Sequence, residues 1–187
     1  MIKRVFDFFL AMLLLVIFLP LMLLVAIVVK FTSKGPIIFW SQRAGKNNQL
    51  FWMPKFRTML IETPNVATHL LVGANQYLTP VGSFLRKSSL DELPQLWSVI
   101  CGDMSLVGPR PALFNQADLI ELRTAVGAHS LIPGITGLAQ INGRDELALS
   151  EKVSFDQEYL QRQSLAFDIH ILWLTLLKVF RREGISH

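Results

Sequence analysis

The chain has 187 residues, of which 51% are hydrophobic, and a formal net charge of +4. This length allows one domain with a sizeable core, and the mean hydropathy of +0.41 points to a membrane segment. The single cysteine, Cys101, excludes an intrachain disulfide and a cysteine-rich zinc site. The chain is basic, but it contains no DNA- or RNA-binding motif, so nucleic acid is not expected as a partner.

The first predicted element is an uncharged apolar segment, residues 8–29. About twenty apolar residues suffice to span a bilayer, but the segment is too long for a signal peptide and no small-residue cleavage site follows it. Pro20 bends a helix near its middle, and basic residues flank both ends, so the positive-inside rule gives no direction of crossing. We therefore favour a re-entrant membrane helix over residues 1–32, bent at Pro20, rather than a simple spanning helix.

A basic stretch follows, with no acidic residue between Phe8 and Ile61. Residues 35–40, GPIIFW, predict a turn and then a strand, and in PKFRTM the side chains of Lys55 and Arg57 fall on one face of a strand. Arginine and lysine are the side chains that bind phosphate. The stretch is therefore either an anion site or a surface attracted to anionic lipid headgroups.

Two adjacent carboxylates, Asp91 and Glu92, stand within RKSSLDELPQLWSVI, residues 86–100. Ser89 followed three residues later by Glu92 is the pattern of a helix capping box, and a proline two residues further on is tolerated near a helix start. The pair is thus either a helix cap or a reactive centre, and the local sequence alone favours the cap.

Two segments rich in glycine come next. Residues 102–113, GDMSLVGPRPAL, predict a loop, in which Arg110 is stiffened between two prolines and suits either a phosphate clamp or a plain surface turn. Residues 132–144, IPGITGLAQINGR, match no phosphate-binding loop. We expect an irregular segment there, packed near the membrane or the active site.

Two helices are predicted at the end of the chain. Residues 149–164 form an amphipathic pattern with a strongly polar face. Residues 165–184 are apolar with a basic end, which suits a helix lying in the membrane interface. The histidines show no metal-ligand spacing: His69, His129, His170 and His187.

Together these stretches resemble the bacterial sugar transferases, also called monotopic phosphoglycosyl transferases. The most specific part of the likeness is SLDELPQLW joined to GDMSLVGPRP, residues 89–97 and 102–111. The other matching stretches are KRVFD, GPIIFWSQRAGKNNQLFWMPKFRTM, IPGITGLAQINGR and SFDQEYLQRQSLAFDIHILWLTLLKVF. The resemblance covers nearly the whole chain in the expected order, so a helix cap alone no longer accounts for the two carboxylates.

The resemblance implies an enzyme that moves a sugar 1-phosphate from a UDP-sugar to undecaprenyl phosphate, with UMP leaving. It also implies Mg²⁺ and a covalent phospho-sugar intermediate on Asp91, with Glu92 as its partner, both carboxylates being candidate metal ligands. A helix N-terminus is expected to keep Asp91 ionised. Our candidates for the phosphate cradle are Lys55, Arg57, Arg86 and Arg110. Short members of the family often use N-acetylated or amino-deoxy sugars, so the resemblance implies a UDP-sugar donor of that kind, with UDP-glucose or UDP-galactose as the alternative.

The sequence also departs from the family pattern in three places. The proline of the membrane helix is often preceded by serine, whereas here it follows Leu19. Residues 75–79, NQYLT, stand where Asp-x-Arg-x-Thr is common. Residues 143–152, GRDELALSEK, lie where differences between substrates are expected.

The expected architecture is a membrane-associated α/β fold, mostly helical with a small sheet. It comprises the re-entrant helix of residues 1–32 and a catalytic domain of residues 33–187 with C-terminal interfacial helices. The resemblance implies a place on the cytoplasmic face of the inner membrane, among its lipids, and leaves a homodimer open. The alternatives are a non-catalytic adaptor that binds lipid phosphates and a bitopic protein whose domain lies outside the cytoplasm.

Overall fold

The structure is a computed structural model and describes residues 2–64, 73–143 and 146–181. His69, His187 and the predicted segment ends at residues 144 and 182–184 lie outside these ranges. The elements are α1 (Ile2–Thr32), β1 (Ile38–Ala44), η1 (Lys46–Asn48), β2 (Leu50–Phe56), η3 (Ala74–Tyr77), α2 (Gly82–Lys87), η4 (Leu90–Glu92), α3 (Gln95–Cys101), β3 (Ser105–Val107), α4 (Ala117–Ala125), η5 (Ala128–Ser130), β4 (Gly134–Thr136), α5 (Leu138–Ile141), α6 (Leu149–Arg162) and α7 (Leu165–Arg181). The mostly helical class is confirmed, but the described strands form two separate two-stranded sheets rather than one.

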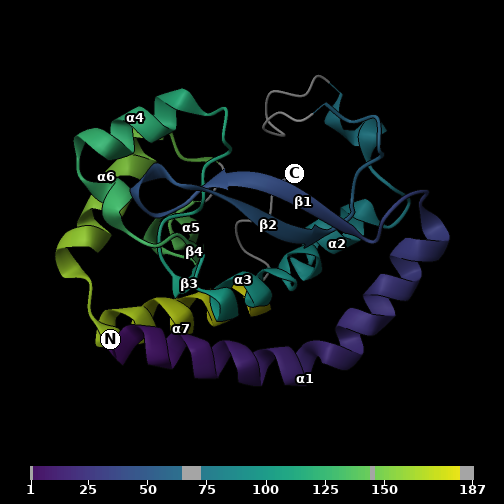
Figure 1. The fold of residues 1–187 in the computed structure, drawn as a ribbon, viewed down its shortest axis with the longest axis horizontal. Helices are drawn as coiled ribbons and strands as arrows, with labels where there is room; N and C mark the ends of the chain where they lie inside the picture. Colours follow the sequence, from purple (N-terminus) through teal and green to yellow (C-terminus); the bar gives the residue numbers. More distant parts are fainter. Residues whose placement is uncertain (1, 65–72, 144–145, 182–187) are drawn as a thin grey trace.

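The N-terminal helix α1 is continuous over 31 residues, with Pro20 inside it. Figure 1 shows that it bends partway: its first half runs beside α7, and its second half rises toward α2 and β1. A proline within a helix removes one backbone hydrogen bond and clashes with the preceding turn, which explains the bend. In length and composition α1 is the one described helix able to cross a bilayer. The re-entrant topology stays a prediction.

Each half of α1 packs against the rest of the chain. Ala11, in the first half, is fully buried in a hydrophobic cluster that includes residues of α3, β3, α6 and α7. Val25 and Val29, in the second half, pack in another cluster with Phe56 and Leu85. The outer faces of α1 expose many large apolar side chains. An apolar surface of this size marks a membrane-associated helix.

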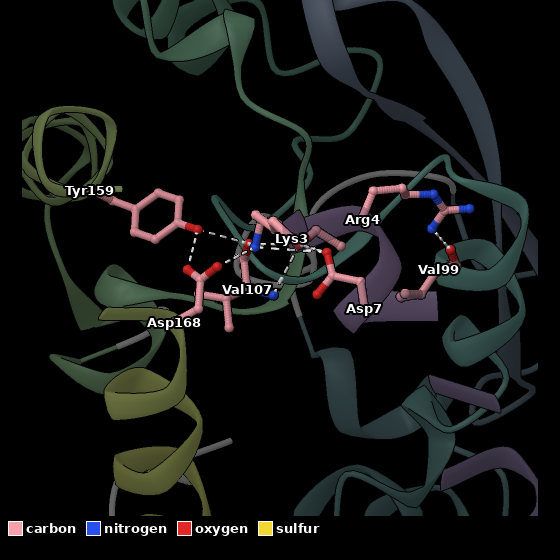
Figure 2. A network of polar contacts seen from close by, with 8 residues as sticks. Lys3, Arg4, Asp7, Val99, Val107, Tyr159 and Asp168 are labelled. Atoms are coloured by element: carbon pink, nitrogen blue, oxygen red, sulfur yellow. Dashed lines mark hydrogen bonds and ion pairs between the residues drawn. The ribbon is translucent and has the colours of Figure 1, made fainter. Parts of the chain in front are cut away.

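Polar contacts tie the first turn of α1 into the body of the protein (Figure 2). The Lys3 ammonium donates to the Val107 carbonyl at 3.1 Å and pairs with Asp168 at 2.6 Å, and the Tyr159 hydroxyl donates to Asp168 at 2.6 Å. The Arg4 guanidinium donates to carbonyls in the last turn of α3, which satisfies the end of that helix. Lys3 and Arg4 are therefore anchoring residues as well as basic flanking charges.

The first sheet is the antiparallel hairpin of β1 and β2, in which Ser41 lies opposite Met53. The predicted strand at the start of β1 is confirmed. The predicted alternation in β2 holds only in part, because Lys55 lies in the strand whereas Arg57 follows its last residue.

The second sheet pairs β3 with β4 in parallel, with Val107 opposite Thr136. These strands lie in residues 102–113 and 132–144, where the sequence predicted a loop and an irregular segment, so both predictions were wrong over these short strands. Each strand has only three residues, too few for a pattern of alternation to be visible. Their pairing depends on contacts between distant parts of the chain.

Both C-terminal helices are confirmed within the described residues, α6 ending two residues earlier than predicted. α6 buries Val153, Asp156 and Tyr159, which are spaced by three residues and share one face. α7 buries Ile171. Its exposed large apolar side chains are Ile169, Trp173, Leu176 and Val179. This division fits the expected amphipathic helix.

Candidate active site

The two carboxylates lie on a single 3₁₀ turn, η4, which leads through Leu93 and Pro94 into α3. Ser89 has a left-handed backbone (φ 55°) and makes no side-chain capping bond. Because an N-cap residue needs an extended backbone, the alternative of a Ser89 helix cap is excluded here. Instead, the Glu92 N–H donates to the Ser89 carbonyl at 3.2 Å.

Two leucines, Leu90 and Leu93, fix this turn against the body. Both pack on the hydrophobic cluster formed by the second half of α1, the end of β2 and α2. The turn thus holds its apolar side chains inward and presents the carboxylates beside the hairpin. The same cluster connects the position of the carboxylates to the position of the membrane helix.

Glu92 joins three elements through one carboxylate oxygen. Its Oε1 accepts from the Lys55 ammonium of β2 at 2.9 Å and from the Arg110 guanidinium of the loop after β3 at 2.8 Å. The Glu92 side chain is 12% exposed, that of Lys55 16% and that of Arg110 32%. Charge-assisted bonds of this kind hold both cations in defined positions.

Asp91 is 7% exposed, and its carboxylate has no hydrogen bond or ion pair among the described residues. Burial raises the pKa of Asp91 to about 6 from the ordinary 3.8; the charge of Lys55 opposes this rise, that of Glu92 adds to it, and those of Arg86 and Arg110 oppose it. Burial has the largest effect on this pKa and opposes ionisation, and the expected contribution of a helix N-terminus stays a prediction. Near pH 7 the carboxylate is ionised, unpaired and poorly solvated, which are properties of a reactive nucleophile.

Lys55 is the charged group that most strongly opposes the rise in the pKa of Asp91. Burial lowers the pKa of the Lys55 ammonium itself, while the Glu92 carboxylate partly restores it. A cation on this strand, next to two carboxylates, is placed to attract an anionic substrate.

The structure brings together most but not all of the predicted site residues. Asp91, Glu92, Lys55 and Arg110 lie in one group, and the Arg86 charge reaches Asp91 from α2, where its guanidinium also contacts the Met59 sulfur at 3.7 Å. Arg57 lies elsewhere. It is 8% exposed and donates to the Lys34 carbonyl at 3.2 Å. Its part in a phosphate cradle stays a prediction.

Two residues of this region were missed by the sequence analysis: Arg123 and Asp156. They form a buried ion pair at 2.7 Å, and Arg123 also donates to the Arg110 carbonyl at 2.8 Å. A signal was present, because Asp156 lies at helical spacing between Val153 and Tyr159, on what proves to be the buried face of α6.

The donor set is compatible with Mg²⁺, provided that the substrate supplies ligands too. Among the described residues no group of three or more His, Cys, Asp or Glu side chains could hold a metal ion. Mg²⁺ is commonly held by one or two carboxylates together with substrate phosphates and water. The adjacent carboxylates of Asp91 and Glu92 fit such an arrangement.

Known proteins resemble this chain over nearly its full length. The family model described as bacterial sugar transferase matches residues 1–182. The exopolysaccharide production protein ExoY of Rhizobium meliloti (strain 1021) is 37% identical, over 98% of this chain and 88% of the relative. The UDP-glucose:undecaprenyl-phosphate glucose-1-phosphate transferase of Escherichia coli (strain K12) is 41% identical, over 96% of this chain and 40% of the relative.

A third relative is the undecaprenyl-phosphate galactose phosphotransferase of Salmonella typhimurium, strain LT2. It is 38% identical, over 97% of this chain and 41% of the relative. The chain therefore spans most of ExoY but less than half of the two relatives whose names specify a sugar. The family match and these identities agree with the carboxylate turn and the proline-flanked arginine, and the chain belongs to the bacterial sugar transferase family.

Proposed function

We propose that this enzyme transfers a hexose 1-phosphate, of glucose or galactose, from a UDP-hexose to undecaprenyl phosphate and releases UMP. The observation that carries the proposal is the likeness, over 96–97% of this chain, to relatives named for these two reactions. The N-acetylated or amino-deoxy donor favoured by the sequence finds no support among these names. The hexose alternative takes its place.

The first chemical step belongs to Asp91 in this proposal. A carboxylate oxygen of Asp91 attacks the phosphorus that carries the sugar, forming an Asp91 oxygen–phosphorus bond. The bond from that phosphorus to the oxygen bridging it to the uridylyl phosphorus breaks, and UMP leaves with the electron pair. An oxygen of undecaprenyl phosphate then attacks the same phosphorus and releases the Asp91 carboxylate, so no proton needs to be transferred in either displacement.

The neighbouring charges suit this chemistry. Both substrates are anions, and an ionised Asp91 repels them. Lys55 and Arg110, held on Glu92 at 2.9 and 2.8 Å, place two positive charges beside the attacking group. Preorganised charges of this kind stabilise the negative charge of the transition state. We assign Glu92 the role of holding these cations.

We further propose Mg²⁺ as the cofactor, held by Asp91 and Glu92 together with phosphate oxygens of the donor. When bound, Mg²⁺ neutralises charge on the transferring phosphoryl group and on the departing UMP. The residues of the chain orient the donor around it.

The membrane proposal is a re-entrant α1 with the catalytic body on the cytoplasmic face of the inner membrane. The first turn of α1 binds Asp168 through Lys3, and its last turn continues through a short link into β1. Both ends are therefore attached to one body. A straight helix of 31 residues would separate its ends by about 46 Å. Because this length exceeds the thickness of the hydrocarbon core of a bilayer, a straight α1 that spanned the membrane would place its two ends on opposite sides, away from a single body.

UMP release tests the proposed reaction. Purified protein with Mg²⁺ and undecaprenyl phosphate is offered UDP-glucose, UDP-galactose, UDP-N-acetylglucosamine and UDP-N-acetylgalactosamine in turn. We expect release from a hexose donor, and a loss of at least about a thousandfold in Asp91→Asn. Release only from the N-acetylated donors would overturn the hexose assignment. Equal release by Asp91→Asn would overturn the nucleophile, and no release from any donor by folded, membrane-bound protein would favour the adaptor alternative.

A further inference from the structure

We propose that Arg123 and Asp156 are positioning residues for the transfer: their buried ion pair fixes the backbone of Arg110 and thereby aims the Arg110 guanidinium at Glu92. This inference rests on the proposed function for its kinetic consequences. Its geometric content, which concerns where Arg110 is held, is independent of the donor.

The Arg123 guanidinium uses all three of its nitrogens. Its Nε and Nη2 lie 2.8 and 2.7 Å from the Asp156 Oδ2, and its Nη1 donates to the Arg110 carbonyl at 2.8 Å. Arg123 comes from the last turn of α4 and Asp156 from the middle of α6, two helices that lie together in Figure 1. Arg123 is 8% exposed and Asp156 2%. The planar guanidinium holds this orientation rigidly.

The stability of the protein does not by itself explain such a pair. Taking two charges out of water is unfavourable, and well-packed apolar side chains often serve equally well in their place. What an apolar pair cannot do is donate a hydrogen bond to a backbone carbonyl. The distinctive contribution of Arg123 is therefore its third contact, to the Arg110 carbonyl.

The segment around Arg110 depends on such contacts, because the prolines on either side of it have no N–H to donate. Four consecutive carbonyls in this segment are each held by a separate donor. The Gly134 N–H donates to the Pro109 carbonyl at 2.9 Å, and the Arg123 guanidinium donates to the Arg110 carbonyl at 2.8 Å. The Arg43 guanidinium donates to the Pro111 carbonyl at 3.2 Å, and the Ala44 N–H donates to the Ala112 carbonyl at 3.0 Å. Of these four contacts, the Arg123 bond is the one made to the residue whose side chain reaches Glu92.

Without the hydrogen bond from Arg123 to its carbonyl, the Arg110 backbone could shift. The Arg110 side chain, which is 32% exposed, could then move away from Glu92 toward solvent. A displacement of about 1 Å at a catalytic group commonly lowers rates about a hundredfold. The expected signature is a fall in kcat with little change in KM.

The informative variant is the double substitution Arg123→Met with Asp156→Leu. It removes both buried charges together, so no unpaired charge is left in the core, while the shapes are roughly kept. The matched control is Arg162→Gln with Glu158→Gln, an exposed ion pair on the same helix α6 that does not touch Arg110. If the double variant does not fold, Arg123→Lys replaces it, because lysine keeps the charge but cannot make all three contacts.

We expect the double variant to fold and to lose about ten- to a hundredfold in kcat with little change in KM. The control pair keeps wild-type values. Wild-type kcat in a folded variant, or a change in KM alone, would overturn the proposal.

A spectroscopic measurement separates this inference from the proposed reaction. In ¹⁵N spectra of arginine side chains, the Arg110 signal, assigned with Arg110→Lys, reports whether its guanidinium is held or rotates freely. We expect a held Arg110 in the wild type and a freely rotating one in the double variant, whether or not a donor is turned over. A held Arg110 in the double variant would overturn the positioning role, even if kcat fell. Wild-type inactivity with this expected spectral change would count against the proposed reaction alone.

Discussion

The carboxyl group of Asp91 is buried without a hydrogen-bond or ion-pair partner among the described residues, and this placement affects stability as well as reactivity. Its pKa of about 6 in the folded protein lies above the ordinary 3.8, so the folded state binds the proton more tightly than the unfolded chain. The free energy of unfolding therefore falls as the pH rises from about 4 to 6. Above pH 6 the full cost of burying the ionised Asp91 carboxylate remains. At about 1.36 kcal/mol per pH unit, this difference corresponds to about 3 kcal/mol.

Asp91→Asn should therefore stabilise the protein while it abolishes activity. At pH 7.5 we expect the thermal midpoint in detergent to rise by several degrees, and the gain to vanish near pH 3, where both the folded and the unfolded wild type are largely protonated. The control is Asp103→Asn, at an exposed carboxylate, which should leave the midpoint unchanged. A midpoint of Asp91→Asn at or below that of wild type at pH 7.5 would contradict the stated cost of burying Asp91.

The same pKa sets an acid limit on the reaction. Only the ionised Asp91 attacks, so kcat/KM should fall about tenfold per pH unit below about pH 6. Because the Lys55 charge opposes the rise in the pKa of Asp91, Lys55→Met should move this limb to higher pH, whereas Lys46→Met, at an exposed lysine on the hairpin turn, should not. A limb that stays near pH 4 in the wild type would show that another group controls the rate.

At the scale of elements, the first turn of α1 depends on one buried carboxylate. Asp168 is 1% exposed and is held by Lys3 and Tyr159, both at 2.6 Å. Lys3→Met removes the only opposite charge within 4 Å of Asp168 in the described structure. We expect a loss of about 2–4 kcal/mol in unfolding free energy.

A double-mutant cycle measures this contribution. Lys3 pairs with two buried carboxylates, Asp168 at 2.6 Å and Asp7 at 3.7 Å. Adding Asp168→Asn to Lys3→Met removes the charge of the nearer one, so the double variant should be more stable than Lys3→Met alone. Lys30→Met, at an exposed lysine near the other end of the same helix, is the control and should have little effect. Additive effects of the two substitutions would show that Lys3 and Asp168 do not interact in solution.

Elements of the site differ in how far the sequence predicts them. Asp91 and Glu92 are adjacent in one distinctive motif, and the prolines flanking Arg110 mark that residue locally, so the sequence identifies all three. The backbone of Ser89 could not be predicted, since an S-x-x-E pattern looks the same in a capping box and in a left-handed turn. Arg57 was placed with Lys55 by strand alternation, which fails because the strand ends between them.

The rest of the fold was unpredictable for a different reason. The long apolar helix and both C-terminal helices carry patterns many residues long, and they are where the sequence expected them. The pairing of β3 with β4 joins segments of three residues about thirty positions apart, and a register such as Val107 with Thr136 leaves no local trace. Partners such as Arg123 and Asp156 are likewise set by packing of helices, not by spacing in the sequence.

At the scale of the whole molecule, the placement of both ends of α1 on one body predicts the side of the membrane on which each lies. In a Cys101→Ser background, Ile2→Cys reports the start of α1 and Asn47→Cys the tip of the hairpin; both positions are exposed. A membrane-impermeant maleimide should label both in inverted inner-membrane vesicles and neither in intact spheroplasts. Labelling of the two positions from opposite sides would show that α1 spans the bilayer.

The ion pair between Lys3 and Asp168 also orders events during biosynthesis. The two residues are 165 positions apart, so the ribosome adds Asp168 roughly 8 to 33 seconds after Lys3 at ordinary rates of translation. During that interval the apolar helix is already available to lipid, while the carboxylate that holds its first turn does not yet exist. The first turn of α1 therefore takes its final position only after Asp168, in the first turn of α7, has been made. The C-terminal part of the chain thus completes the attachment of the N-terminal helix.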